Sequence, residues 1–123
     1  MPVTRLFEHA SDAKVVPAGT TLFREGDPRD FMYAVLDGAI ELYVGGTLVE
    51  TVERGGLFGE MALIEKESRG ATAVAKTDAK VVAVDEAKFL FLIQQTPNFS
   101  IHVMKVLSDR LRRMNERLAR PGR

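Results

Sequence analysis

The residues of this sequence that could bind a phosphorylated ligand lie between Gly55 and Thr72, in the stretch GGLFGEMALIEKESRGAT. Glycine lacks a side chain, so the glycines at the start of the stretch allow the backbone to approach a ligand closely. Residues 60–63 are good helix formers, and the start of a helix presents unpaired N–H groups and a partial positive charge. The stretch therefore predicts an anion site built largely from backbone.

Two charged side chains of the stretch indicate what the ligand carries. Arg69 has a planar guanidinium whose N–H donors match the oxygens of a phosphate better than an ammonium group would. Glu60 is itself an anion, and its carboxylate only accepts hydrogen bonds. A carboxylate beside an anion site suits a ligand that also carries hydroxyl groups, such as a sugar phosphate. The small residues 70–72 then return the chain to a strand and leave room for the ligand.

In their order and spacing these residues resemble the cyclic nucleotide-binding domain family. The phosphate-binding cassette of that family carries F-G-E, then A-L, then R-x-A-T. The corresponding residues here are Phe58-Gly59-Glu60, Ala62-Leu63 and Arg69-Gly70-Ala71-Thr72. The likeness continues upstream through residues 19–27 and 32–38, and downstream through parts of 84–97. It implies a β-roll that binds cAMP, or alternatively cGMP, in signal transduction and catalyses no reaction.

The resemblance also implies a role for individual residues. Glu60 would hold the ribose 2′-hydroxyl, and Arg69 would hold the cyclic phosphate. Backbone N–H groups of Gly59, residues 61–62 and Gly70 would complete the cradle. The whole expected set of ligand-binding residues is Phe58, Gly59, Glu60, Met61, Ala62, Arg69, Gly70, Ala71, Thr72 and Asn115.

Two of these residues bear on the base of the ligand. Asn115 is included because an alignment with regulators of the catabolite-activator type, made on Arg110-Leu111, places Met114 and Asn115 where family members meet the purine. Its amide both donates and accepts, so it could read an adenine edge. Gly70 stands where the family commonly has serine, threonine or alanine. A threonine there often helps to hold guanine, so its absence favours cAMP over cGMP.

The composition is typical of a single globular domain without a metal centre. The chain has 123 residues, of which 46% are hydrophobic and 28% charged, with no net charge and no cysteine. It has neither a transmembrane-length apolar run nor the hydrophobic region of a signal peptide, so a cytoplasmic location is expected. The two histidines, His9 and His102, fall in predicted helices at opposite ends of the chain. A metal-dependent enzyme on a similar roll would need clustered histidines, so no metal and no catalytic residue are expected.

The pattern of the first two thirds of the chain predicts a mainly β fold. Short apolar or alternating segments, separated by turn residues, are typical of an antiparallel β-roll or jelly-roll-like barrel, here over about residues 13–84. Residues 3–10 predict a short N-terminal helix. The pairs Asp37-Gly38 and Gly45-Gly46 each predict a tight hairpin. Strands are expected at residues 14–16, 20–23, 31–36, 40–44, 47–52, 71–75 and 80–84.

Two helices are expected after the roll. Asp85 is a plausible N-cap for a helix over about 86–95, which Pro97 interrupts. The second helix covers about 98–120 and carries a heptad-like apolar stripe of Met104, Leu107, Leu111, Met114 and Leu118. The stripe could pack on the chain's own roll or form a homodimer, and the sequence leaves both open. The many arginines of this helix are most simply its solvated face.

The sequence as a whole predicts one cyclic nucleotide-binding sensor domain over residues 1–123, which signals by repositioning its C-terminal helices. Its partners would be the nucleotide, an unidentified effector protein and a second copy of the chain. No helix-turn-helix follows the long helix, so neither direct DNA binding nor membrane binding is expected. The alternatives are the sensory domain of a longer transcription regulator or channel, and a degenerate fold that no longer binds nucleotide.

Overall fold

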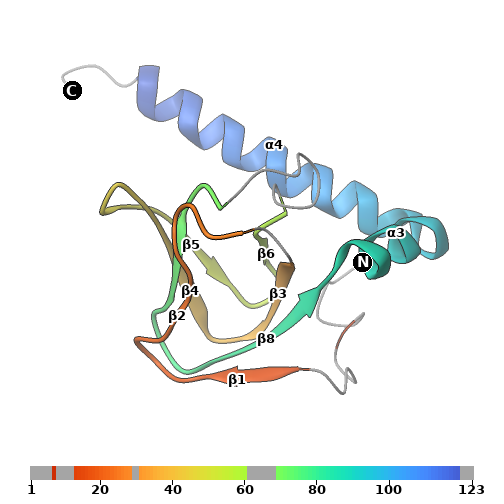
Figure 1. The fold of residues 1–123 in the computed structure, drawn as a ribbon. Helices are drawn as coiled ribbons and strands as arrows, with labels where there is room; N and C mark the ends of the chain where they lie inside the picture. The colour runs from red at the N-terminus through yellow and green to blue at the C-terminus, as the bar shows by residue number, and fades with distance from the viewer. Residues whose placement is uncertain (1–6, 8–12, 29–30, 61–68, 120–123) are drawn as a thin grey trace.

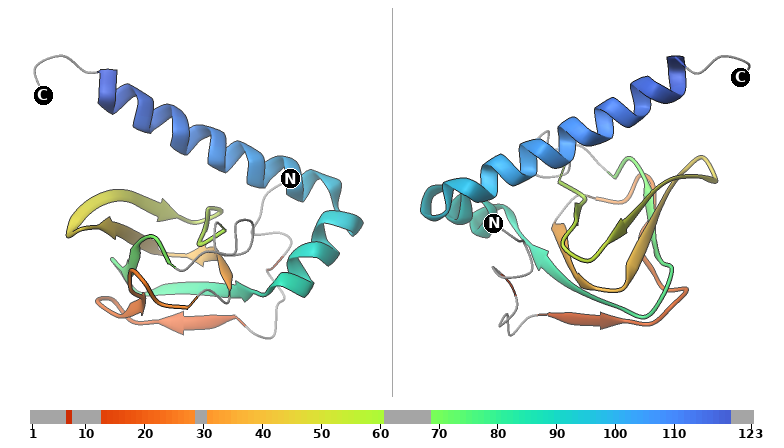
Figure 2. Two further views of the ribbon diagram at one scale, coloured as in Figure 1. Left: turned by 45° about the horizontal axis from the view of Figure 1, so that its top comes forward. Right: turned by 180° about the vertical axis from the view of Figure 1, so that it is seen from behind.

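A computed structural model describes residues 7, 13–28, 31–60 and 69–119 of the chain. Within this part the strands form two four-stranded antiparallel sheets, with the orders β1-β8-β3-β6 and β2-β7-β4-β5. Figures 1 and 2 show the two sheets curling into a roll, with a long helix lying across one end. The predicted antiparallel roll with two C-terminal helices is confirmed, whereas the predicted N-terminal helix, apart from Phe7, lies outside the described residues.

The strands are short and follow the segments that the sequence predicted, with one addition. That addition is the two-residue strand Leu57–Phe58, inside the stretch singled out for ligand binding. The bounds are β1 Lys14–Val16, β2 Thr21–Phe23, β3 Met32–Asp37, β4 Ala39–Val44, β5 Thr47–Glu53, β6 Leu57–Phe58, β7 Thr72–Ala75 and β8 Ala79–Val84.

One of the two predicted hairpins is wrong. The strands on either side of Asp37-Gly38 do not pair, because β3 pairs with β6 and β8 while β4 pairs with β5 and β7. Gly38 instead forms a corner, with φ of 79°, at which the chain passes from one sheet to the other. A Cβ at this position would lie 2.3 Å from the carbonyl oxygen of Asp78, so glycine is required for the close approach.

The second hairpin is confirmed at Gly45-Gly46. The two glycines have φ of 57° and 81°, as a type I′ turn requires, and join β4 to β5 with Val44 opposite Thr47. This leaves β5 at the edge of its sheet, next to the end of the roll that the long helix covers.

The core consists of two groups of apolar side chains, and β6 contributes to both. Phe58 lies in the group between the two sheets, where its ring stacks on Tyr33 with centroids 5.1 Å apart. Leu57 belongs to the group beneath the helices, together with Phe99 and Val103. Each fully buried side chain of this size stabilises the fold by roughly 1.5–3 kcal/mol. Residues 59 and 60, which follow directly, are therefore held by both parts of the core.

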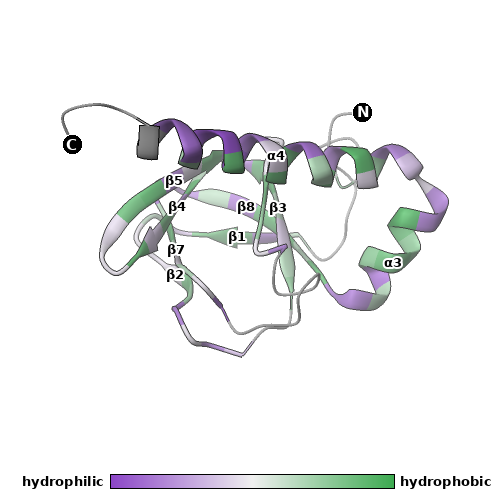
Figure 3. Cartoon of the chain, turned by 90° about the horizontal axis from the view of Figure 1, so that it is seen from above, coloured by the Kyte–Doolittle hydropathy of each residue, from purple (hydrophilic) through white to green (hydrophobic). Residues whose placement is uncertain are grey.

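Two helices close the described part of the chain. Helix α3 (Glu86–Gln95) begins at the predicted cap, where the Asp85 carboxylate accepts a hydrogen bond from the backbone N–H of Lys88 at 2.8 Å. It ends before Pro97, which is the first residue of α4 (Pro97–Ala119). Figure 3 shows mixed colours along α4, with hydrophilic residues prevailing in its C-terminal half. Apolar packing of α4 on the roll is concentrated in its first part, where Phe99 and Val103 are buried and Leu107 packs against them.

Candidate functional site

A cavity of about 450 Å³ lies between the roll and α4. Its walls combine apolar side chains of the roll and of α4 with charged side chains where the helix meets the roll. The lining residues are Phe23, Leu42, Val44, Val49, Glu50, Gly59, Glu60, Arg69, Gly70, Ala71, Arg110, Arg113 and Met114. The volume falls in the range of small-molecule sites, and the mixture of apolar walls and a few charged groups is typical of them.

Arg69 lies against the wall of this cavity and is almost entirely buried, with 5% of its surface exposed. Its guanidinium donates to the carbonyl oxygens of Gly59, at 3.3 Å, and Phe31, and lies 4.0 Å from the ring centroid of Phe23. Its backbone N–H donates to the carbonyl of Asp27 at 2.9 Å. The guanidinium is thus fixed by a cation–π contact and by two carbonyls before any ligand is considered.

Gly59 lies between the two charged residues that the sequence singled out, and its backbone permits their approach. Its φ is 78°, in the region that favours glycine. A Cβ built on Gly59 would lie 2.8 Å from Nη1 of Arg69. Any larger residue would therefore displace the Arg69 guanidinium as well as strain the backbone.

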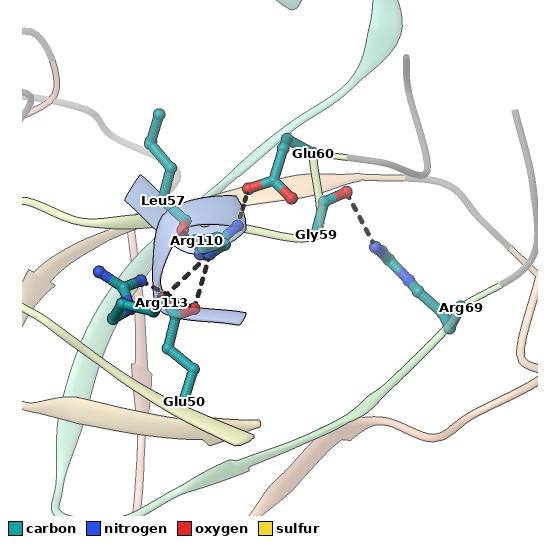
Figure 4. Close-up of polar contacts among 7 residues, drawn as sticks. All are labelled: Glu50, Leu57, Gly59, Glu60, Arg69, Arg110 and Arg113. Carbon is teal, nitrogen blue, oxygen red and sulfur yellow. Dashed lines mark hydrogen bonds and ion pairs between the residues drawn. The ribbon is translucent and has the colours of Figure 1, made fainter. Parts of the chain in front are cut away.

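Glu60 is the most buried carboxylate of the site, with 3% of its surface exposed, and it contacts α4 directly (Figure 4). Nη1 of Arg110 donates to Oε1 of Glu60, and Nη2 donates to the carbonyl oxygen of Leu57. Burial lowers the pKa of Arg110, but the nearby carboxylates of Glu60 and Glu50 outweigh it, so the pKa is raised above its ordinary value. Arg110 is therefore a permanent cation in this site.

Glu50 on β5 supplies the second carboxylate at the junction. Nε of Arg110 lies 2.8 Å from Oε1 and 2.9 Å from Oε2 of Glu50. Nη2 of Arg113 lies 3.2 Å from the same Oε1. Arg110 consequently connects β5, in one sheet, with Glu60, which follows β6 in the other sheet.

The side of α4 that faces the roll changes character along the helix. Phe99 and Val103 are buried in the core, and about two and three turns further on the roll-facing positions are Arg110 and Arg113. Of the predicted apolar stripe, Leu107 packs against the core, while Met104 and Leu111 are 56% and 60% exposed. Packing on the roll thus accounts for only part of the stripe. The interpretation of the arginines as a solvated face does not hold for Arg110, whose side chain is 16% exposed, whereas the Arg113 side chain is half exposed.

The structure brings together most of the residues predicted from the cassette. Gly59, Glu60, Arg69, Gly70 and Ala71 all line the cavity. Residues 61–62 lie outside the described part of the chain.

The remaining predicted residues are placed differently. The Phe58 ring points into the core, so only its backbone could serve a ligand. The Thr72 hydroxyl accepts a hydrogen bond from the backbone N–H of Glu25 at 3.1 Å, and Thr72 does not line the cavity. Asn115 is exposed and is also outside the lining set, whereas its neighbour Met114 belongs to it.

Sequence reasoning missed the charged residues that α4 and β5 bring to the site. Arg110 and Arg113 are three residues apart and so share one side of the helix, a grouping that the sequence indicates, but no signal in the sequence assigned that side to the site. Glu50 carried no such signal, because its contact depends on how α4 lies over the roll.

Other kinds of site find no support in the described residues. Within that part of the chain no group of three or more histidine, aspartate or glutamate side chains could hold a metal ion. Neither α3 nor α4 has the length and hydrophobicity that crossing a membrane requires.

Comparison with known proteins points to one family. The family model described as the cyclic nucleotide-binding domain matches residues 13–96. A cAMP-dependent protein kinase regulatory subunit from Aspergillus niger is 40% identical over 86 residues, which are 68% of this chain and 21% of that protein. The corresponding regulatory subunit from Candida albicans is 36% identical over 103 residues, which are 76% of this chain and 22% of that protein. This chain therefore spans about a fifth of the length of both relatives.

A similar solved structure is the catabolite activator protein of Thermus thermophilus. It has a TM-score of 0.75 and 31% identity, over 86% of this chain and 52% of that one.

Proposed function

The chain belongs to the cyclic nucleotide-binding domain family, and from this premise we propose that it binds cAMP in the cavity beneath α4 and signals through that helix. The observation that carries the proposal is the convergence of Glu60 and Arg69 on one cavity, with Gly59 between them. A hydroxyl-binding carboxylate and a phosphate-binding guanidinium are the two groups that a cyclic nucleotide needs.

The walls of the cavity suggest how the ligand would lie. The cyclic phosphate would be held by Arg69 and by backbone N–H groups near residues 70–71, and the ribose 2′-hydroxyl by Glu60. The base would occupy the apolar part, which is lined by Leu42, Val44, Val49 and Met114. Apolar walls contact the faces of a base and select weakly among bases. A preference for cAMP would therefore depend on polar groups of the protein that contact the edge of the base.

The contact between Arg110 and Glu60 supports the proposed output. The carboxylate that would hold the ribose already holds α4, so ligand and helix share one group. We assign Oε2 of Glu60 to the ribose hydroxyl, since Arg110 engages Oε1. A ligand that binds better when α4 lies over the cavity would shift the population toward that arrangement, and an effector protein could detect the change.

The extent of the unit and its self-association are part of the proposal. Residues 1–123 would act as one sensor domain in the cytoplasm, without catalytic activity, and dimerise through the exposed apolar residues of α4. The activities of whole relatives are not included, because the chain spans about a fifth of the curated regulatory subunits.

Isothermal titration calorimetry with cAMP, cGMP and cyclic di-GMP tests the ligand. Cyclic di-GMP is included because the c-di-GMP responsive regulator CLP of Xanthomonas campestris has a similar solved structure. The TM-score is 0.79, with 25% identity over 96% of this chain and 63% of that one. We expect cAMP to bind tightest. A stronger response to cyclic di-GMP would replace the proposed ligand, and binding of none of the three would overturn the proposal.

A further inference from the structure

Among the residues that the structure describes, Glu50 makes most of the ion-pair contacts between the roll and α4. Two arginines of α4 place three nitrogen–oxygen contacts on this one carboxylate, at 2.8, 2.9 and 3.2 Å. The Glu50 side chain is 17% exposed and that of Arg110 16% exposed, so solvent screens this pair less than an ordinary surface pair. Glu60 receives one contact from the same helix.

These contacts attach α4 to the roll, unlike the ion pair within α4 that the structure describes. Arg112 pairs with Asp109 three residues earlier on α4 itself, and 63% of the Arg112 side chain is exposed. Such a pair stabilises helical structure but does not attach the helix to anything. The pairs of Glu50 join β5 to residues sixty or more positions later in the chain.

The attachment also lies where apolar packing of α4 has ended. Val103 is buried, whereas Leu111 and Met114 are mostly exposed. The segment of α4 beyond Leu107 covers residues 108–119, and a helix of about that length is marginal in water by itself, so contacts with the roll contribute to its order. In the described part of the chain, the ion-pair contacts between this segment and the roll converge on Glu50 and Glu60.

We propose that Glu50 is a positioning residue that holds α4 over the ligand cavity before any ligand is present. Glu50 also lines the cavity, but its carboxylate oxygens are engaged by Arg110 and Arg113, so its main effect on the ligand is through the helix. The cavity persists beneath α4 in this arrangement, which makes the arrangement competent to bind. The effect of Glu50 on affinity rests on the function proposed above, whereas its effect on the helix does not.

A quantitative relation follows from this role. When only a fraction of the molecules has α4 in place, the apparent dissociation constant of a ligand rises in inverse proportion to that fraction. Loosening the helix in the free protein should therefore weaken cAMP binding by the same factor. Saturating cAMP should in turn restore the helix, because Glu60 and the ligand still hold it.

The test is hydrogen exchange of the free protein carrying Glu50→Gln. The carboxamide keeps the shape, but it loses the charge and directs an NH₂ group at the arginine donors. We expect exchange in residues 104–116 to accelerate about tenfold, the scale of losing one charge-assisted hydrogen bond. Exchange in β4 and β7 should not change. Glu53→Gln, an exposed carboxylate on the same strand, is the matched control and should leave α4 as in wild type.

Three outcomes would overturn the proposal. They are unchanged exchange in 104–116 of Glu50→Gln, an equal acceleration throughout the roll, and the same acceleration in Glu53→Gln. A double-mutant cycle with Arg113→Met adds a second check, since the two substitutions should be less than additive if they remove the same contact. If wild type binds no nucleotide, the proposed function fails while these measurements on the free protein still decide the role of Glu50.

Discussion

Arg110 of α4 donates to Glu60 of the roll, fifty residues earlier in the chain, and also to both carboxylate oxygens of Glu50. One guanidinium thus joins the two sheets at the end of the roll where the cavity opens. A change at any of these three residues should alter both the position of α4 and the site beneath it.

Arg69 should be the residue on which cAMP affinity depends most. Removing one partner of a desolvated, hydrogen-bonded charge pair costs roughly 2–5 kcal/mol, and the low end corresponds to about thirtyfold in affinity. Calorimetry should therefore show Arg69→Ala binding cAMP at least about thirtyfold more weakly. Arg54→Ala, which removes an exposed arginine that does not line the cavity, is the control. An Arg69→Ala protein that is folded and within threefold of wild type would contradict the assignment.

Glu60 should act on the ribose. Glu60→Ala removes an acceptor for the 2′-hydroxyl, and a hydrogen bond to a charged group is worth about 1–3 kcal/mol. Wild type should bind 2′-deoxy-cAMP more weakly than cAMP, while Glu60→Ala should hardly distinguish the two. The comparison is made within each variant, so any loosening of Arg110 affects both ligands alike. Equal discrimination by both proteins would remove Glu60 from the ribose.

Gly70 should set part of the preference between cAMP and cGMP. A Cβ built on Gly70 meets no atom within 4 Å, and the backbone there is not in the region reserved for glycine, so threonine should be accommodated. Gly70→Thr should raise the affinity for cGMP relative to cAMP in competition binding, with Gly70→Ala as the control without a hydroxyl. A ratio of affinities that does not move, or a wild type that already prefers cGMP, would refute this role.

The exposed apolar residues of α4 should support a homodimer. Leu111 is 60% exposed and Met104 56% exposed, and burying both against a second copy would remove apolar surface from water. Sedimentation should show a concentration-dependent dimer. Leu111→Asp should dissociate it, because the carboxylate would be desolvated without a partner. Arg112→Gln changes the net charge by the same amount at an exposed position off the apolar stripe and serves as the control. A wild-type monomer at high concentration, with and without cAMP, would exclude the dimer.

Stability should fall on mild acidification because of His102. Burial lowers the pKa of His102 below its ordinary value of 6.5, so the unfolded chain binds a proton more readily than the folded one. The stability due to neutral His102 is therefore present above pH 6.5 and is lost as the pH falls toward the lowered folded pKa. Urea unfolding between pH 7.5 and 5.5 should show this decrease, and His102→Gln should reduce its slope. If His102→Gln has the same pH dependence of stability as wild type, groups other than His102 cause the decrease.

Local signals in the sequence were sufficient for most elements of the fold. Alternating apolar residues identified β4, and the Asp85 side chain identified the start of α3, because both signals act over a few residues. The hairpin predicted at Asp37-Gly38 was wrong because a positive φ at Gly38 permits a tight turn without determining which strand the chain pairs with next. Which sheet the next strand joins is decided by pairing with strands far along the chain.

The candidate site divides in the same way. Gly59, Glu60 and Arg69 come from one stretch whose spacing carries the ligand-binding pattern, and the structure brings them to one cavity. Glu50 and Arg110 are sixty residues apart, and their contact exists only because α4 crosses the end of the roll. No periodicity in either segment could have paired them.

The short strand β6 has a thermodynamic consequence for the ligand. Leu57 and Phe58 are buried in different halves of the core, and Gly59 and Glu60 follow them without a spacer. The cavity therefore needs both halves to be packed, and no partly unfolded form that lacks either can hold the nucleotide. A ligand that binds only the intact molecule raises the unfolding free energy of the protein by about 2.7 kcal/mol when the free ligand concentration is a hundred times the dissociation constant. Occupancy of this site should accordingly lengthen the lifetime of the whole domain against proteolysis, including strands that never touch the ligand.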